Sequence, residues 1–405
     1  MQPALFLILM KIWYDDIILN PLTRFLMKLQ SNPNVYPYVP FYDLSDKNIR
    51  QNIVEKKYIS EEDLREAVSR ISQPNFSLSG KTEAEKILSI FEGDQIRFGP
   101  KKFIIQGKAG WIDRLNYFIR QNIPIQFTIL GFPFKIPIPL KTNRVYPDMG
   151  EVLSLIRLHF IATEIQKIYS SGAIITIFTE GAFGRFTGVE DANWIAYRDF
   201  LKELIDMLCF ERQLRIFDLS EMEKTIPDFS KRFQEKVRLL EEMYKQGDLK
   251  IREAYNGTLD AVLRIIAPRK NDTVLLMDVY NDHLPDDSVS ETVKTIREDI
   301  RQRARASIFQ YHAYLRVRDD VQYLEKVVPR AVALSVSPKP NRLGVIPVNS
   351  ECVRLPYHGV PVHDPSRGVF TIEYLIDLQR SPLSYSAVYF KKDKEKKPFY
   401  YIIRF

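Results

Sequence analysis

The segment AIITIFT, residues 173–179, is an almost unbroken run of β-branched and aromatic side chains. Such a run is typical of a strand that is covered on both faces, as in a parallel sheet. A long apolar helix is predicted before it, over residues 149–171, and a second helix after it, over residues 190–208. This alternation of helices with a buried strand predicts an α/β domain built on a mostly parallel sheet.

The neighbouring segments extend this pattern in both directions. Strands are also predicted over residues 103–108, 123–130 and 214–219, whereas residues 220–325 have a mainly helical pattern. The last part of the chain is rich in strand-like runs. It ends in a predicted hairpin, residues 386–405, with a lysine-rich turn.

We therefore predict an α/β fold with a Rossmann-like, mostly parallel sheet flanked by helices, a helical insertion at about 220–325 and a β-rich C-terminal part. Residues 1–78 are expected to form an N-terminal arm and a first helix, which pack on an α/β domain of residues 79–405. Sheets of this kind bind ligands at the carboxyl ends of their strands, so the loops 131–147 and 180–188 are the first candidates for a site.

Composition narrows the classes of protein further. The chain has 405 residues, a formal net charge of +7 and only two cysteines, Cys209 and Cys352. The charge favours anionic partners, but charges of both signs are interspersed, so a solvated mixed surface is preferred to a nucleic-acid site. Two cysteines cannot form a disulfide framework or a cysteine-rich metal site, which fits a reducing, cytoplasmic compartment. The apolar residues 4–10 are too few to span a bilayer and are expected to pack as part of the arm.

The loop GFPFKIPIPLKTNRVYPDMGE, residues 131–151, combines four prolines with three cations, Lys135, Lys141 and Arg144. A preorganised cationic loop suits a phosphate or carboxylate ligand, although a rigid surface connection explains it equally well. Asp148 and Glu151 have the spacing of a capping box, with Asp148 at the N-cap and Glu151 at N3. The alternative is that one of these acids faces the substrate.

Glu180 follows the buried strand and precedes the glycine-bearing segment GAFGRFTG, which contains Arg185. The dinucleotide fingerprint and the P-loop are both absent. Glycines allow close ligand approach, and Arg185 could meet a phosphate. A tight turn with a solvated Glu180 is the structural alternative.

Two further patterns are weaker. RLPYHGVPVHD, residues 354–364, holds His358 in a constrained turn, where a histidine could act as an acid–base group. RQRAR, residues 301–305, could be a basic patch for nucleic acid, but a solvated helix face is the favoured interpretation.

Several of these stretches together resemble one known family. Residues 131–151 resemble the signature of the isocyanide (isonitrile) synthases, the family of the pyoverdine/dityrosine biosynthesis proteins. FTEGAFGRFTGVEDANWIAYRDFLKEL (178–204), PRAVALSVSPKPNRLGVIPV (329–348) and LPYHGVPVHD (355–364) resemble later blocks of that family in the expected order. The resemblance covers roughly residues 80–380.

The resemblance implies an enzyme that joins the α-amine of an amino acid to the C2 ketone of ribulose 5-phosphate. The sugar is then fragmented with loss of phosphate, and its C2 remains as the isocyanide carbon. No metal or redox cofactor is implied, and ribulose 5-phosphate is a co-substrate. Many members act beside an iron/2-oxoglutarate oxygenase, which is therefore an expected downstream partner.

This chemistry suggests roles for the candidate residues. Cations would hold the phosphate or the amino-acid carboxylate, and acids or a histidine would move protons. The expected anion contacts are Lys141, Arg144, Lys135 and Arg185, and the expected proton-transfer groups are Glu180, Asp148 and His358.

The chain departs from the family pattern at four positions. Ile136 and Ile138 stand where small polar residues are usual, Ser337 stands where a histidine is expected, and Tyr357 replaces an expected tryptophan. The amino-acid substrate, whether tyrosine, tryptophan or an aliphatic residue, is not specified by these motifs. A dityrosine-type role in spore-wall or pigment precursors and a non-catalytic phosphometabolite-binding protein are the alternatives.

Overall fold

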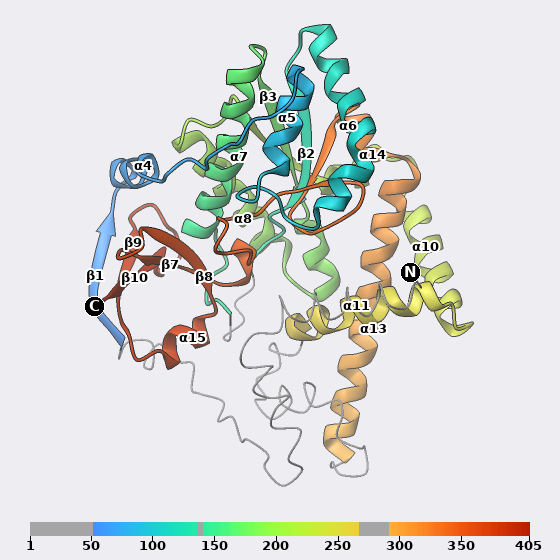
Figure 1. The fold of residues 1–405 in the computed structure, drawn as a ribbon. Helices are drawn as coiled ribbons and strands as arrows, with labels where there is room; N and C mark the ends of the chain where they lie inside the picture. The colour runs from blue at the N-terminus through green and yellow to red at the C-terminus, as the bar shows by residue number, and fades with distance from the viewer. Residues whose placement is uncertain (1–51, 136–140, 267–290) are drawn as a thin grey trace. The chain divides into compact units, whose positions relative to one another are not determined.

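The computed structural model describes residues 52–135, 141–266 and 291–405 (Figure 1). The chain divides into two compact units, Met1–Ser45 and Asp46–Phe405, and all described residues belong to the second. The main sheet of this unit has the strand order β4-β3-β2-β5-β6, and every neighbouring pair is parallel. Its strands are β2 (Ile125–Gly131), β3 (Ala173–Thr179), β4 (Leu214–Asp218), β5 (Val332–Ser335) and β6 (Leu343–Gly344). The predicted fold class is thus confirmed.

Alternate side chains of the strands enter two different cores, as expected for a sheet that is covered on both faces. Ile175 and Ile177 of β3 belong to the larger core, whereas Phe178 belongs to the core on the other face. The larger core receives side chains from α5 (Glu83–Glu92), α6 (Lys101–Gln121), α7 (Met149–Ile168) and α8 (Asp191–Met207). The other face is covered by α9 (Met222–Thr225), α13 (Glu291–Asp320) and α14 (Tyr323–Val327).

The strand predicted over residues 103–108 is wrong, because these residues lie within α6. Phe103 and Ile104 are buried, but Ile105 is 64% exposed, so the apolar run follows one face of a helix. Gly107 is placed under the ring of Trp111, where a Cβ atom would come within 2.6 Å of the indole.

Helices occupy most of the described chain between β4 and β5. α10 (Phe229–Lys245) and α11 (Leu249–Ile266) both pack against the long helix α13. Residues 267–290 of the predicted insertion, and residues 1–51 of the predicted arm, lie outside the described residues. The domain boundary at residue 78 therefore stays a prediction.

The β-rich C-terminal part forms a second sheet with the order β1-β9-β10-β7-β8. The predicted hairpin is confirmed, since β9 (Ser384–Phe390) pairs antiparallel with β10 (Tyr400–Arg404). The blue strand β1 (Ile53–Ile59) lies beside the red β9, although more than three hundred residues separate them (Figure 1). The remaining strands are β7 (Val360–Asp364) and β8 (Val369–Glu373), and the short helices α4 (Glu61–Ser69) and α15 (Leu375–Arg380) flank the sheet in sequence.

The strand order places a topological switch point beside β2. The chain runs from β2 through β3 to β4 on one side, and it returns to β5 on the other side of β2. Ligands bind at such points, outside the carboxyl ends of the strands. Among the described helices, none has the length and apolarity needed to cross a membrane.

Candidate functional site

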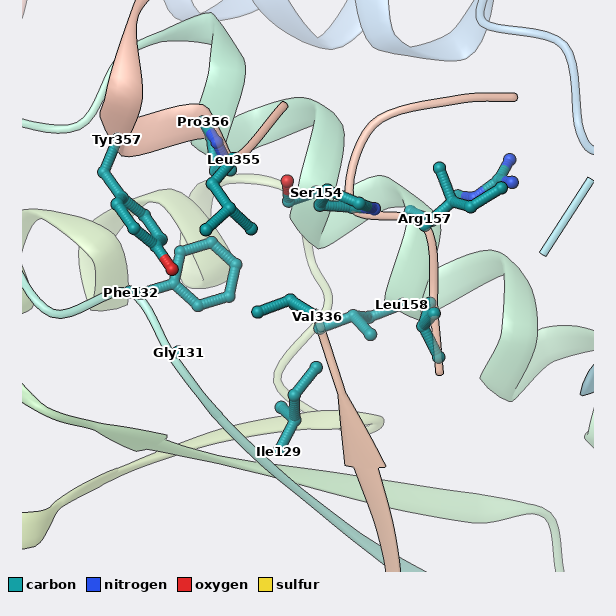
Figure 2. Close-up of a pocket in the computed structure, with 13 residues that line it drawn as sticks. Ile129, Gly131, Phe132, Ser154, Arg157, Leu158, Val336, Leu355, Pro356 and Tyr357 are labelled. Atoms are coloured by element: carbon teal, nitrogen blue, oxygen red, sulfur yellow. The ribbon is translucent and has the colours of Figure 1, made fainter. Parts of the chain in front are cut away.

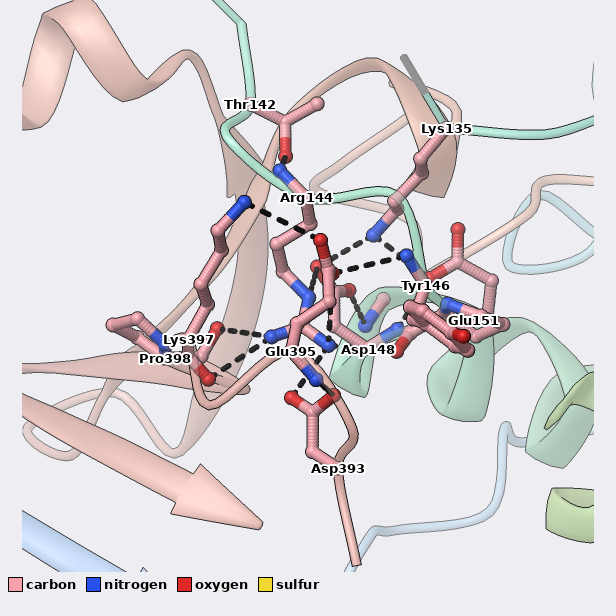
Figure 3. Close-up of polar contacts among 12 residues, drawn as sticks. Lys135, Thr142, Arg144, Tyr146, Asp148, Glu151, Asp393, Glu395, Lys397 and Pro398 are labelled. Atoms are coloured by element: carbon pink, nitrogen blue, oxygen red, sulfur yellow. Dashed lines mark hydrogen bonds and ion pairs between the residues drawn. The ribbon is translucent and has the colours of Figure 1, made fainter. Parts of the chain in front are cut away.

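The loop that follows β2 ends in a buried network of charges (Figure 3). The Lys135 ammonium lies 2.5 Å from Asp148 Oδ2 and 2.9 Å from Glu151 Oε2, and all three side chains are fully buried. The predicted capping box at the start of α7 is confirmed. The backbone N–H of Asp148 donates to Glu151 Oε2 at 2.8 Å, and that of Gly150 donates to Asp148 Oδ1 at 2.8 Å.

Arg144 connects this network to the hairpin turn of the second sheet. Its Nη2 atom lies 2.7 Å from Asp393 Oδ2, and its Nη1 atom donates to the carbonyls of Lys397 and Pro398 at 3.0 and 3.1 Å. Figure 3 shows the guanidinium enclosed between Asp393 and Asp148. The side chain has no exposed surface, so the expected contact of Arg144 with a substrate stays a prediction.

Burial sets the electrostatics of the network. Desolvation raises the pKa of Asp148 to about 7, a shift that Lys135 opposes and the neighbouring Glu151 reinforces. Lys141, the third cation of the loop, is half-buried, and its ammonium lies 6.0 Å from the centre of the Tyr374 ring. Ile136 and Ile138 lie outside the described residues.

Glu180 lies at the carboxyl end of β3 in a different group of charges. Desolvation raises the pKa of Glu180, and three cations oppose this shift: Arg318, Lys339 and Arg342. Arg318 comes from the end of α13, and the other two come from the loop between β5 and β6. We refer to these four residues as the Glu180 cluster.

The cations of the Glu180 cluster also act on one another. Desolvation and the neighbouring Arg342 lower the pKa of Lys339, and desolvation and Arg318 lower the pKa of Arg342. Arg318 is 5% exposed, and its Nη1 atom has no hydrogen-bond partner. The positive charges thus oppose one another at the edge of the sheet, and an anion bound between them would relieve this repulsion. Among the described residues, no ion pair joins Glu180 to any of the three cations.

A cavity of about 260 Å³ lies beside Asp319, the carboxylate that accepts a hydrogen bond from Arg318, although none of the four residues of the Glu180 cluster lines it. Asp319, which follows Arg318, and Asn341, which precedes Arg342, both line it. Thr128 of β2 and Gln322 contribute further polar groups, and Trp111 of α6 forms part of the wall.

Arg185 lies outside the Glu180 cluster. Its Nε atom donates to Asp191 Oδ1 at 2.8 Å, and its Nη1 atom donates to Glu223 Oε2 at 2.8 Å. These two acids already occupy the donors that a substrate anion would need. The predicted role of Arg185 as an anion contact stays a prediction.

A second, much smaller cavity of about 10 Å³ lies at the switch point between β2 and β5 (Figure 2). The rings of Phe132 and Tyr357 lie next to each other at one end, and Arg157 extends away from them. His358 follows Tyr357, and their ring centres are 4.8 Å apart, but His358 is exposed and is not among the residues that line this cavity. Ser337 lies after β5, and its hydroxyl is 3.3 Å from that of Ser335.

The structure therefore separates the residues that the sequence singled out. It brings Lys135, Arg144 and Asp148 into one buried network and places Glu180 in another group. Sequence reasoning missed Lys339 and Arg342, although they stand in KPNR, directly after the strand of a block that resembles the family. No sequence pattern distinguishes Arg318 from the other arginines of α13, so the sequence could not single it out.

Comparisons with known proteins agree with this architecture and with the sequence motifs. Residues 115–375 match the family model of the pyoverdine/dityrosine biosynthesis protein. The L-tyrosine isonitrile synthase of Pseudomonas aeruginosa is 30% identical over 265 residues, which cover 64% of this chain and 75% of that protein. The L-tryptophan isonitrile synthase AmbI1 of Fischerella ambigua is 27% identical over 267 residues, which cover 63% and 75%.

The crystal structure of the PvcA protein from Pseudomonas aeruginosa has the same fold. It matches with a TM-score of 0.57 and 21% identity, and the match covers 78% of this chain and all of that chain. The family match extends over more than half of this sequence. The chain belongs to the pyoverdine/dityrosine biosynthesis protein family and is an enzyme of the isonitrile synthase type.

Proposed function

We propose that this enzyme converts the α-amine of an aromatic L-amino acid, tyrosine or tryptophan, into an isonitrile, with ribulose 5-phosphate as the carbon donor. The amino-acid class is supported by the relatives, which are named as tyrosine and tryptophan isonitrile synthases. The observation that carries the proposal is the Glu180 cluster at the carboxyl end of β3. It combines a carboxylate of raised pKa with three cations, two of which have lowered pKa values.

Glu180 is suited to the first chemical step. An amino acid enters as an ammonium ion, and it must lose a proton before the amine can attack the C2 ketone of the sugar. A carboxylate whose pKa is raised by desolvation is a stronger base than an exposed glutamate. Glu180 is therefore assigned as the group that accepts this proton.

The later loss of phosphate requires positive charge near the leaving group. In this proposal the cations of the Glu180 cluster supply it, instead of the loop cations that the sequence suggested. His358 remains the candidate acid for the fragmentation, because its ring contacts that of Tyr357, which lines the cavity at the switch point. A downstream iron/2-oxoglutarate oxygenase is the expected partner.

The test is a mass-spectrometric assay with ribulose 5-phosphate labelled with carbon-13 at C2 and a pool of the common amino acids. The expected result is one aromatic amino acid that gains a labelled isonitrile carbon. An aliphatic product would correct the amino-acid class, and a formylated tyrosine would favour the dityrosine-type role. Folded protein that gives no labelled product would contradict the proposal.

A further inference from the structure

Arg318 is the starting point, because it is a buried cation with an unused donor. Its Nε atom donates to Asp319 Oδ1 at 2.7 Å, whereas Nη1 has no hydrogen-bond partner. A buried charged donor without an acceptor is unfavourable and requires an explanation. The described residues offer no acceptor for Nη1, so a ligand atom is the natural candidate.

Lys339 and Arg342 bring two more cations to the same place. Among the described residues, neither side chain forms an ion pair, although both influence the pKa of Glu180. The arginines of the network around Asp148 and of the Asp191–Glu223 pair are, in contrast, held by carboxylates. Arg157 of α7 also has two buried donors without a hydrogen-bond partner among the described residues, but it lines the small cavity at the switch point. Near Glu180, Lys339 and Arg342, which form no ion pair within the described part of the chain, add two cations to the free donor of Arg318.

We propose that Arg318, Lys339 and Arg342 form a phosphate-binding subsite, and that the adjoining cavity holds the hydroxylated chain of a phosphorylated sugar. The inference rests on the proposed function, because it names where the carbon donor binds. Arginine and lysine are the usual partners of phosphate oxygens, the arginines as planar forks and the lysine as a point charge.

The lining of the cavity supports a sugar rather than an aromatic side chain. Thr128, Gln322 and Asn341 present hydroxyl and amide groups, which pair with sugar hydroxyls. Charged groups of the lining are Asp319, which accepts from Arg318, and the Arg114–Glu325 ion pair. The volume of about 260 Å³ lies just below the range of pockets that hold drug-sized ligands, which suits a five-carbon chain. The small apolar cavity at the switch point has neither property.

The balance of charge predicts a proton-linked binding event. Three cations and two carboxylates, Glu180 and Asp319, give this group of side chains a formal charge of +1. Tyr311 of α13 also faces Arg342. A phosphate dianion would make the site negative, and a nearby negative charge raises the pKa of a carboxyl group. Binding should therefore be accompanied by proton uptake at Glu180.

Isothermal titration calorimetry of the full chain, in phosphate-free buffers, tests the subsite directly. Ribulose 5-phosphate, ribulose and inorganic phosphate are the probes, and Lys339→Gln and Arg342→Gln are the variants. Each variant should weaken ribulose 5-phosphate binding roughly 10- to 100-fold, because one charge-assisted contact is lost. Lys339 is open to solvent, although neighbouring groups partly desolvate its ammonium, so its replacement should leave the fold intact.

Arg316→Gln is the matched control. Arg316 lies two residues before Arg318 on the same helix, but it lines a different cavity, between α11 and α13. The Arg316→Gln substitution also removes one positive charge, but it should leave the affinity for ribulose 5-phosphate unchanged. Ribulose 5-phosphate should bind more tightly than inorganic phosphate, since only the sugar reaches the polar cavity. Equal affinities would overturn the assignment of the cavity.

Proton uptake supplies an independent readout. Titrations near pH 6 in two buffers of different ionisation enthalpy should show uptake for the wild type and less uptake for Glu180→Gln. Wild-type affinity in folded Lys339→Gln and Arg342→Gln would overturn the subsite, even if labelled isonitrile were formed. If the wild type binds ribulose 5-phosphate tightly, both variants abolish this binding and no isonitrile is formed, the subsite is supported and the proposed function is contradicted.

Discussion

The buried charge network predicts that Arg144→Ala damages the fold rather than the affinity for the sugar phosphate. The substitution removes the cation that faces Asp393 at 2.7 Å and Asp148 at 3.7 Å, and it frees the carbonyls of Pro147, Lys397 and Pro398. Breaking a buried ion pair from one side costs about 3–5 kcal/mol, because a charge is left buried without compensation. We expect the free energy of unfolding to fall by about this amount.

Urea denaturation at pH 7, followed by circular dichroism, measures the loss. Lys394→Ala is the control, because this lysine of the same hairpin turn is 61% exposed and lies 3.8 Å from Glu203. An exposed pair of this kind contributes about 0–1 kcal/mol. The double variant Arg144→Ala/Asp393→Asn should recover part of the loss, since it also removes the uncompensated carboxylate. The expected coupling energy is roughly 0.5–3 kcal/mol.

Enzyme kinetics distinguish a structural role of Arg144 from the role as an anion contact that the sequence suggested. If Arg144 is structural, the folded fraction of Arg144→Ala should keep a nearly normal KM for ribulose 5-phosphate. An Arg144→Ala protein of wild-type stability, with a KM raised tenfold or more, would refute the structural assignment and restore Arg144 as a phosphate contact.

Three further predictions follow from named contacts. Asp148 has a folded pKa of about 7, above its unfolded value, so its contribution to stability is present below about pH 4 and is lost as the pH rises toward 7. Asp148→Asn should flatten this part of the curve of unfolding free energy against pH, and an unchanged curve would exclude Asp148 as the source of the pH dependence. Glu180→Gln should abolish isonitrile formation with little change in the free energy of unfolding. The wild-type kcat/KM should rise with pH through a pKa above that of an ordinary glutamate, because the base must be ionised. If neither the substitution nor the pH alters the rate in this way, Glu180 is not the group that accepts the proton. Gly344→Ala should severely lower the yield of soluble, folded protein, because a Cβ atom would overlap the carbonyl oxygen of Phe98. Gly110→Ala in the middle of α6 is the control, because its Cβ atom meets no atom within 4 Å and should be neutral or stabilising by up to about 1 kcal/mol. Equal stability of the two variants would show that the backbone at Gly344 can move.

The order of the main elements could be predicted from local sequence patterns. The run at 173–179 became β3, the hairpin at the C-terminus formed as predicted, and the capping box at Asp148 and Glu151 is present. These features depend on residues only a few positions apart, so periodicity and cap chemistry suffice. The segment 103–108 was assigned wrongly, because six residues are too few to distinguish a strand from the start of a helix.

The site could be predicted only in part. The sequence places Glu180 at the carboxyl edge of the sheet, because it directly follows a buried parallel strand, and its role in a site stays a prediction. It suggested Lys135 and Arg144 as anion contacts, since charge and rigidity are visible in the loop. The tertiary structure buries both side chains. Lys135 lies against Asp148 and Glu151, and Arg144 lies against Asp393 and Glu395 of the distant hairpin turn.

What the sequence by itself determined is the fold class, the family and the edge of the sheet where the candidate residue Glu180 lies. Only the tertiary structure decided which cations remain free there. Arg318 and Glu180 are 138 positions apart, yet the fold brings α13 near enough to the end of β3 for the charge of Arg318 to lower the pKa of Glu180. Whether an arginine binds a ligand or stabilises the fold depends on which carboxylates the folded chain brings within a few ångströms of it, and that distance is not encoded in any local pattern.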